Sequence, residues 1–325
     1  MRYREQRPAE PAHRDGPAAP VDLVLVGHVG SATDRTPRGT ATYTGGSGFA
    51  AAFAASALLD RGVGLVTQVG EDFDLACLRL LPIDLQGVAV RPGASATFVI
   101  DQFRDGRMSF RSDLGVAAEP VFGSFPASYF RARYVHLGTA PPRQQLAWLG
   151  YLRDRGFRAQ ISVDMFEPFV AAEPGACRQI CDRADLIFLN EAEYRGLFRG
   201  RRDPSAPTLL KHGRAGAELL ADGARQRVPA APADEVDPIG AGEILAGAFL
   251  ALRAQELAED RALSYAVAVA TRSVTEFGVT GPAVTRELNR VRDKLAIERR
   301  SGGRAPDQAA GEYHQSRREG VTPSS

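Results

Sequence analysis

The sequence predicts an α/β fold: a doubly wound, mostly parallel sheet with helices on both faces and a small β insertion. Short apolar runs that end at a glycine or a polar residue alternate with helix-like stretches through most of the 325 residues. Such runs are typical of parallel strands that are buried on both faces. Between residues 88 and 112 the pattern changes to short alternating strands with Asp105-Gly106 as a hairpin turn, which predicts a β insertion.

The expected elements follow from this periodicity. The strands are residues 21–27, 40–43, 63–69, 88–90, 97–100, 108–110, 134–137, 159–163, 186–189, 208–210 and 217–220. The helices are residues 49–59, 71–81, 144–155, 175–183, 191–197, 244–252, 262–275 and 287–299, and residues 28–39 are expected to be a loop. In such a sheet, ligands bind at the carboxyl ends of the strands.

One folded unit is expected over residues 21–298, because no repeat or linker-like break interrupts it. Residues 1–20 and 299–325 are polar and charged, so we expect a disordered leader and a disordered tail. The leader has no apolar core of the kind that a signal peptide has, and no run approaches the length of a membrane span. These features predict a protein without a membrane partner.

Composition narrows the function classes further. The net charge of +1 does not favour nucleic acid or an anionic membrane surface as a partner. Lys211 and Lys294 are the only lysines beside many arginines. Cys77, Cys177 and Cys181 form neither a disulfide framework nor a metal-ligand set, a pattern that fits a cytoplasmic protein.

The stretch Asp237-Pro238-Ile239-Gly240-Ala241-Gly242-Glu243 carries the strongest chemical signal. Small residues let the backbone approach a ligand, and a helix start offers free N–H groups and a positive dipole end, so an anion site is expected there. Glu243 beside that site suits a general base. The alternative is structural: Gly240 as the N-cap, with Glu243 stabilising the first turn of the helix.

Four further segments precede this stretch in a definite order and spacing along the chain. They are Gly45-Gly46 before a small-residue helix, residues 64–72, Asn190-Glu191-Ala192-Glu193, and Lys211-His212-Gly213 with Gly216. Together they make residues 21–295 resemble the ribokinase-like, or PfkB, family of carbohydrate and nucleoside kinases. Each segment alone is a weak signal, whereas the ordered set is specific.

The resemblance implies transfer of the γ-phosphoryl group of ATP to an alcohol of a small molecule, with Mg²⁺. It implies that Gly240, Ala241 and Gly242 form the anion hole and that Glu243 stands in the place of the catalytic aspartate. The lid would comprise residues 40–44 and 88–112 and would exclude water when closed. Lids of such kinases often pair as β sheets, so a homodimer is compatible with the resemblance.

For the nucleotide and the metal, the resemblance implies one set of residues. Asn190 and Glu193 would organise Mg²⁺ through its waters; the alternative is an ordinary helix start with Asn190 as the N-cap. The remaining nucleotide-binding candidates are Lys211, Gly213, Gly216 and Asp237. For the two glycines the alternative is a plain turn between strands.

For the acceptor, Gly45 and Gly46 would approach its hydroxyls, and the alternative is close helix packing. Thr97, Phe98 and Arg111 are candidates in the lid, with surface strand positions as the alternative. Two weaker candidates lie in or after other strands. His136 is more typical of a core histidine than of a ligand, and Asp164 follows a strand at the edge where ligands bind.

The sequence departs from the family pattern at the acceptor side. Glu243 replaces an aspartate, and Ala32 stands where the first strand of the family usually delivers an aspartate to the acceptor's hydroxyls, so that Asp34, the nearest acid, is the candidate for that contact. Phe49, Ala50 and Ala51 occupy the region that often carries a sugar-binding asparagine. Two hypotheses follow. One is a kinase for an atypical sugar, cyclitol or nucleoside; the other is a catalytically weak relative that binds sugar or nucleotide as a sensor or partner subunit.

Overall fold

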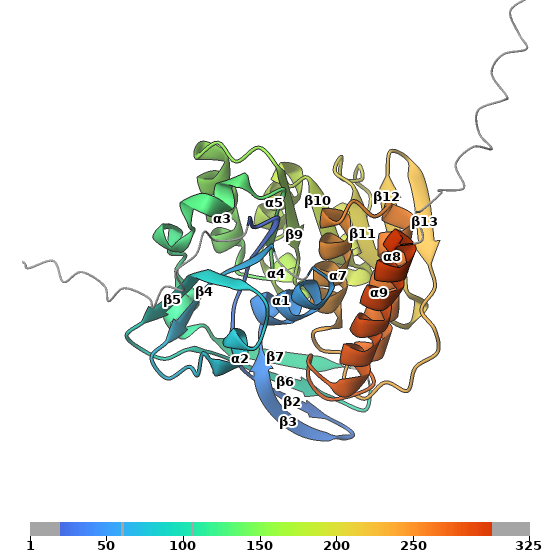
Figure 1. The fold of residues 1–325 in the computed structure, drawn as a ribbon, viewed down its shortest axis with the longest axis horizontal. Helices are drawn as coiled ribbons and strands as arrows, with labels where there is room; N and C mark the ends of the chain where they lie inside the picture. The colour runs from blue at the N-terminus through green and yellow to red at the C-terminus, as the bar shows by residue number, and fades with distance from the viewer. Residues whose placement is uncertain (1–19, 60–61, 106, 301–325) are drawn as a thin grey trace, which may run out of the picture.

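The computed structural model describes residues 20–59, 62–105 and 107–300. A large sheet forms the centre of the molecule, and a smaller sheet lies at one end of it, at the bottom in Figure 1. Residues 1–19 of the predicted leader and 301–325 of the predicted tail lie outside the described residues, and residues 299–300 end a helix. None of the helices in the described ranges is long and apolar enough to cross a membrane.

The large sheet has nine strands and is parallel except at β12 and β13. In spatial order they are β13 (Ala224–Val228), β12 (Ala217–Ala221), β11 (Thr208–Lys211), β10 (Leu186–Asn190), β9 (Gln160–Asp164), β8 (Tyr134–Leu137), β1 (Leu23–Val26), β4 (Val63–Gly70) and β5 (Asp84–Arg91). The predicted doubly wound α/β fold is thus confirmed.

Helices cover both faces of this sheet, and each face has its own apolar core. One face carries α1 (Ser47–Leu58), α7 (Ala241–Ala254), α8 (Glu259–Ser273) and α9 (Pro282–Arg300). The other carries α3 (Pro142–Asp154), α4 (Glu167–Ala172), α5 (Pro174–Arg183) and α6 (Glu191–Phe198). Successive residues of a strand point to opposite faces, so Leu23 and Leu25 join the first core and Val24 and Val26 the second.

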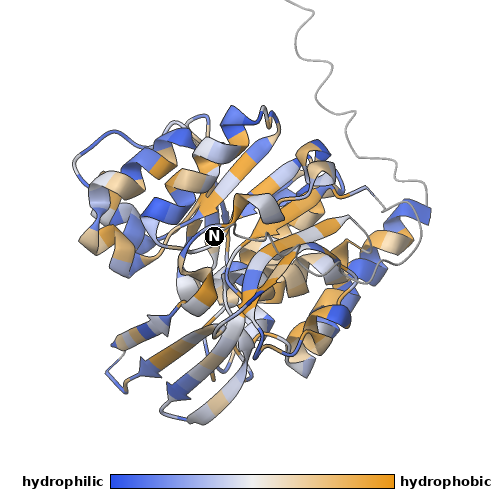
Figure 2. Cartoon of the chain, turned by 90° about the vertical axis from the view of Figure 1, so that its left-hand side faces the viewer, coloured by the Kyte–Doolittle hydropathy of each residue, from blue (hydrophilic) through white to orange (hydrophobic). Residues whose placement is uncertain are grey.

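The lid is a four-stranded sheet in the order β3 (Gly39–Gly45), β2 (Gly30–Thr36), β6 (Ala96–Gln102) and β7 (Met108–Asp113). In Figure 2 its strands are of mixed hydropathy, whereas those of the large sheet are mostly hydrophobic. One face of the lid therefore covers other parts of the molecule and the other faces solvent.

Three expected elements were wrong. Most of the segment expected to be a loop, residues 28–39, contains strand β2, whose alternating burial is that of a half-covered lid strand. Residues 88–90 belong to β5, which pairs in parallel with β4 in the large sheet and not in the lid; its edge position leaves it half-exposed and gives it a lid-like pattern. The helix expected over residues 71–81 is only α2 (Ala76–Arg79), because Asp72 instead accepts hydrogen bonds from Ser95.

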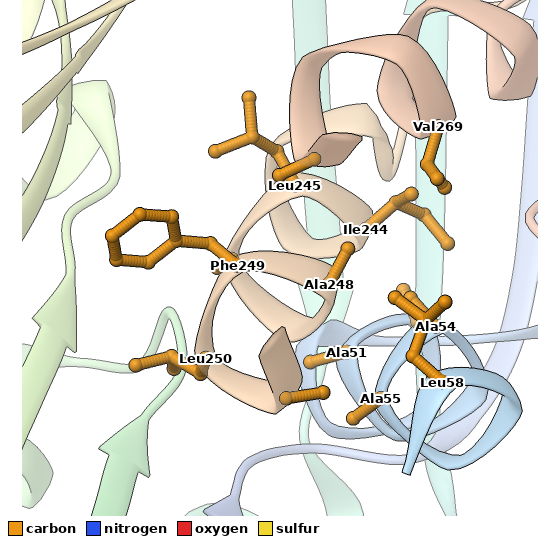
Figure 3. Packing of buried hydrophobic residues seen from close by; sticks show 14 of the residues in the cluster. Ala51, Ala54, Ala55, Leu58, Ile244, Leu245, Ala248, Phe249, Leu250 and Val269 are labelled. Carbon is orange, nitrogen blue, oxygen red and sulfur yellow. The ribbon is translucent and has the colours of Figure 1, made fainter. Parts of the chain in front are cut away.

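The site depends on the contact between α1 and α7, which begin at the two glycine-rich segments. Figure 3 shows the alanines of α1, among them Ala51, close to Ile244 and Ala248 of α7. Gly247 makes this approach possible, since a Cβ atom built on it would lie 2.3 Å from the carbonyl oxygen of Ala51. The small residues of both helices thus set the position of the start of α7.

The substitution Gly247→Ala should lower the free energy of unfolding by about 1–3 kcal/mol, because the added methyl group meets backbone atoms that cannot rotate away. Gly150→Ala on α3 is the matched control. A Cβ atom at position 150 meets nothing within 4 Å, and alanine is a better helix former than glycine, so Gly150→Ala should be neutral or stabilising. Urea unfolding measures both variants, and equal midpoints would contradict the tight contact.

Candidate active site

The predicted anion hole lies at the start of α7. Gly240 is the N-cap with a φ of 79°, and a Cβ atom on it would lie 2.3 Å from Cγ1 of Val279, so only glycine fits. Ala241 donates its N–H to the carbonyl of Pro238 at a long 3.3 Å, and among the described residues the N–H of Gly242 has no backbone acceptor. Free N–H groups and the helix dipole together make the start of α7 chemically suited to an anion.

A lysine ammonium lies beside these N–H groups. Lys211 ends β11, and its Nζ atom would be 3.1 Å from a Cβ atom on Gly242. The same Nζ atom donates to Oδ1 of Asp164 at 2.6 Å, in an ion pair whose carboxylate is buried. Asp164 was only a weak candidate from the sequence; its place at the end of β9, two strands from Lys211, brings it beside the ammonium.

Three carboxyl groups surround this one ammonium. Burial alone would lower the pKa of Lys211, but Asp164, Glu193 and Glu243 raise it above its ordinary value. Burial raises the pKa of Glu193 to about 7, although Lys211 opposes the shift. Burial also raises the pKa values of Asp164 and Glu243. The site has more acidic groups than basic ones, so it takes up protons or cations readily.

Asn190 and Glu193 form a capping box at the start of α6. Oδ1 of Asn190 accepts the N–H of Glu193 at 2.8 Å, and Oε2 of Glu193 accepts the N–H of Asn190 at 2.7 Å. The structural alternative for this motif is therefore present, and it leaves the buried Glu193 carboxyl acting on Lys211.

The donor set around Lys211 suits Mg²⁺ held through water. Carboxylate and amide oxygens are the ligands that Mg²⁺ prefers, and it usually keeps several of its waters. Within the described part of the chain, no group of three or more His, Cys, Asp or Glu side chains could hold a metal ion directly. Oδ2 of Asp164 is buried without a hydrogen-bond partner, so the site has an acceptor to spare.

The two glycines of the nucleotide segment lie in different surroundings. Gly213 has a φ of 56° and nothing within 4 Å of a built Cβ atom, so a ligand can approach it. At Gly216, with a φ of 99°, a Cβ atom would meet the carbonyl oxygen of Val228 at 2.0 Å. The approach of β13 therefore suffices to explain Gly216.

Gly45 and Gly46 lie where the lid meets α1. A Cβ atom on Gly45 would lie 2.6 Å from that of Ala32, and one on Gly46 would lie 2.5 Å from the carbonyl oxygen of His28 and 3.2 Å from the ring of Phe98. Close packing thus accounts for both glycines. It also brings Phe98 over the start of α1.

Aromatic rings from the lid and from the large sheet meet at this place. The rings of Phe98 and Phe110 in the lid are 6.3 Å apart and nearly parallel. His28, after β1, lies 6.5 Å from Phe98, and Phe166, after β9, lies 4.8 Å from Phe110. Sequence reasoning missed all but Phe98, although the pairing of two alternating lid strands could have indicated Phe110.

The other lid candidates lie elsewhere. Thr97 neighbours Phe98 in β6, so it points to the opposite face of the lid and is exposed. Arg111 also lies on the exposed face of the lid and pairs with Asp101 at 2.8 Å. The structure does not bring either side chain to Phe98, and the surface alternative describes their positions.

Asp34 and Asp237 are both buried where the lid meets the segment before α7. Asp34 accepts a hydrogen bond from the hydroxyl of Tyr43. Oδ1 of Asp237 accepts the N–H of Ile239 at 3.1 Å and Nε2 of Gln102, also at 3.1 Å. His136, by contrast, is a core histidine: it is buried, its Nδ1 lies 3.0 Å from Oγ of Ser162, and burial lowers its pKa to about 3.

Comparison with known proteins decides the family. The family model described as pfkB family carbohydrate kinase matches residues 21–286. This chain belongs to the pfkB family of carbohydrate kinases. It is therefore a kinase of the sugar and nucleoside type, as the ordered motifs predicted.

The proteins to which this chain is similar include nucleoside kinases. A cytidine kinase of Thermococcus kodakarensis is 30% identical over 247 residues, which are 71% of this chain and 88% of that protein. A Burkholderia thailandensis nucleoside kinase in complex with inosine has a TM-score of 0.71 at 16% identity, covering 84% of this chain and 98% of the other. A Cryptococcus neoformans ribokinase in complex with ADP has a TM-score of 0.68 at 17% identity, covering 85% and 99%. The likeness to the two solved structures concerns the fold alone.

Proposed function

We propose that this pfkB-family protein is an ATP-dependent kinase of nucleosides, with Glu243 as the general base. The observation that carries the choice of acceptor is the set of rings around Phe98 and Phe110, which could stack on a planar base. Ala32 and Ala50 also support a nucleoside as the acceptor, because both are buried and offer no hydrogen bond to a sugar hydroxyl. The cytidine kinase relative points to the same class of acceptor.

In the proposed reaction, Glu243 removes the proton from the attacking hydroxyl as its oxygen bonds to the γ-phosphorus. The bond from that phosphorus to the β,γ-bridging oxygen breaks, and ADP leaves with the electron pair. The N–H groups at Gly240–Gly242 and the ammonium of Lys211 hold the charge of the transferred group. Mg²⁺, held through water by Asn190 and Glu193, would offset the charge of the phosphates.

The experiment measures ADP formation from ATP and Mg²⁺ with cytidine, uridine, adenosine, inosine, ribose, fructose and myo-inositol. We expect turnover with at least one nucleoside and not with the free sugars or the cyclitol. Turnover with ribose or fructose alone would contradict the nucleoside assignment. No turnover, together with thermal stabilisation by ATP, would favour the catalytically weak binder, for which the glutamate at position 243 is the specific argument.

The lid aromatic ring can be tested separately. Phe98→Ala should raise KM for the nucleoside about ten- to a hundredfold, because base–aromatic stacking contributes about 1–3 kcal/mol per base. Thr97→Ala on the opposite face of the same strand is the matched control and should leave KM unchanged. Phe98→Leu preserves apolar packing of the lid, so a normal KM in that variant would argue against stacking.

A further inference from the structure

A small polar cavity lies at the carboxyl ends of the neighbouring strands β4, β1 and β8. Its volume is about 40 Å³, and its lining includes Thr67, Gln68 and His28 from the strand ends and Gln144 and Gln145 from α3. From β1 the strand order runs to β4 and β5 on one side and to β8 and β9 on the other, so it reverses between β1 and β8. Open α/β sheets bind their ligands at such a reversal.

Two glutamine amides leave their oxygens free in this cavity. Nε2 of Gln68 donates to the carbonyl oxygen of Glu119 at 2.7 Å, and Nε2 of Gln145 donates to those of Gly138 at 3.0 Å and Asp164 at 2.8 Å. A reversed amide would place oxygen against oxygen, so these contacts fix the NH₂ side of each group. Neither Oε1 atom accepts a hydrogen bond from the described part of the chain.

The Thr67 hydroxyl is a further polar group without a partner. Thr67 is buried, it lines the same cavity, and among the described residues its Oγ1 atom has no hydrogen-bond partner. Gln144, by contrast, is already paired: its Oε1 lies 3.2 Å from Nε2 of His28, and its Nε2 donates to the carbonyl of Ala118 at 2.7 Å. Buried polar groups are usually satisfied, so the cavity is suited to a ligand group that brings N–H donors.

His28 connects the cavity with the aromatic rings of the proposed acceptor site. It lines the cavity, and its ring lies 6.5 Å from that of Phe98. Gly138 lines the cavity too, and a Cβ atom on it would lie 2.9 Å from Oγ of Ser47, at the start of α1. A volume of about 40 Å³ holds a few waters or one amino group but no heterocyclic ring. A base against Phe98 would therefore keep its ring outside and place only an exocyclic group in the cavity.

We propose that this cavity binds the exocyclic amino group of cytosine or adenine in the acceptor nucleoside. The two N–H donors of that group would meet the free oxygens of Gln68 and Gln145, beside the Thr67 hydroxyl. Uracil and hypoxanthine carry an oxygen at the same place, which would face two acceptors. The inference rests on the proposed nucleoside kinase function and names the subclass of acceptor: cytidine and adenosine over uridine and inosine.

The first test compares kcat/KM within two matched pairs, cytidine against uridine and adenosine against inosine. The amino member of each pair should be preferred at least about tenfold, because a site built to bind N–H donors discriminates against an analogue that lacks them. Equal values within both pairs, or a preference for the oxo members, would overturn this inference and leave the kinase function intact.

The second test needs no turnover. Calorimetric titration of the full chain with the same four nucleosides measures their Kd values directly. Cytidine and adenosine should again bind at least about tenfold more tightly than uridine and inosine. If the members of each pair bind equally, or if none of the four binds, the inference fails, whatever the kinase activity of the protein.

Two variants test the assigned residues. Thr67→Val keeps the shape and removes a hydroxyl without a partner, so stability should not fall, whereas the preference for cytidine over uridine should fall about two- to tenfold. Gln68→Met removes one free acceptor and should lower the same preference about tenfold. A merely structural loosening would affect both nucleosides alike and leave their ratio unchanged.

Thr271→Val is the matched control for these variants. It removes a buried hydroxyl of α8 that donates to the carbonyl of Val267 at 2.7 Å, and it should not change the preference between the nucleosides. An unchanged preference in either Thr67→Val or Gln68→Met would overturn the proposed binding of the amino group.

Discussion

Glu243→Gln should lower kcat about 10²- to 10⁴-fold, the usual contribution of a general base. The amide has nearly the same shape but cannot take the hydroxyl proton. Binding of ATP should be unchanged, because the N–H groups and Lys211 remain. Single-turnover rates together with nucleotide titrations separate the two quantities, and a variant that keeps its full rate would exclude Glu243 as the base.

The pH profile checks the same assignment. Burial raises the pKa of Glu243, and the neighbouring Asp164 adds to the shift. The base must be ionised to act, so kcat should rise with pH and the rise should lie above the ordinary range of a glutamic acid. The residual rate of Glu243→Gln should lack this rise.

A shorter side chain at position 243 distinguishes an active kinase from a catalytically weak relative. If the site is built around the glutamate, Glu243→Asp withdraws the base by about 1 Å. Such a displacement can lower the rate on the order of a hundredfold, which corresponds to ~2.7 kcal/mol of activation barrier. A gain of activity in Glu243→Asp would show instead that the backbone is built for an aspartate. The natural protein would then be a weakened enzyme.

Lys211→Met should be strongly destabilising, by about 3–5 kcal/mol, because it leaves buried carboxyl groups without their cation. Asp164, Glu193 and Glu243 all act on Lys211, and Asp164 pairs with it directly. Urea unfolding without ligand at pH 7 measures the effect. Arg38→Met, which breaks an exposed pair with Asp234, is the matched control and should not change the midpoint measurably.

The loss of stability in Lys211→Met should depend on pH. Without the ammonium, the folded-state pKa values of the carboxyl groups rise further above their unfolded values. Carboxyl groups with a raised folded-state pKa contribute stability at low pH, and this contribution is lost as the pH rises through that pKa. The stability of the variant should therefore approach that of the wild type as the pH is lowered. A loss that is the same at pH 5 and pH 8 would show that Lys211 acts by packing alone.

The sequence allowed the fold and the glycine-rich start of α7 to be predicted, because both depend on local features. Glycine at position 240 is required by a positive φ and by Val279, and the capping box of Asn190 and Glu193 lies within one helical turn. The pair of Lys211 and Asp164 could not be predicted, since 47 positions separate the two residues and only the strand order brings them together.

The lid was harder to predict. Thr97 and Phe98 are neighbours in one strand, so they point to opposite faces and could not both contact an acceptor from a single face of the lid. Asp34 was expected near the acceptor's hydroxyls; its burial where the lid meets the segment before α7 depends on the pairing of β2 with β3 and β6, which the expected loop concealed.

The close contact of α1 with α7 also limits how this protein can evolve. Gly46 precedes one helix and Gly240 the other, and Gly247 lets the two backbones touch. The contact at Gly247 leaves no room between the two backbones, so mutation cannot easily change the spacing of the N-terminal ends of the two helices. New specificity must then arise by exchanging side chains on an unmoved frame.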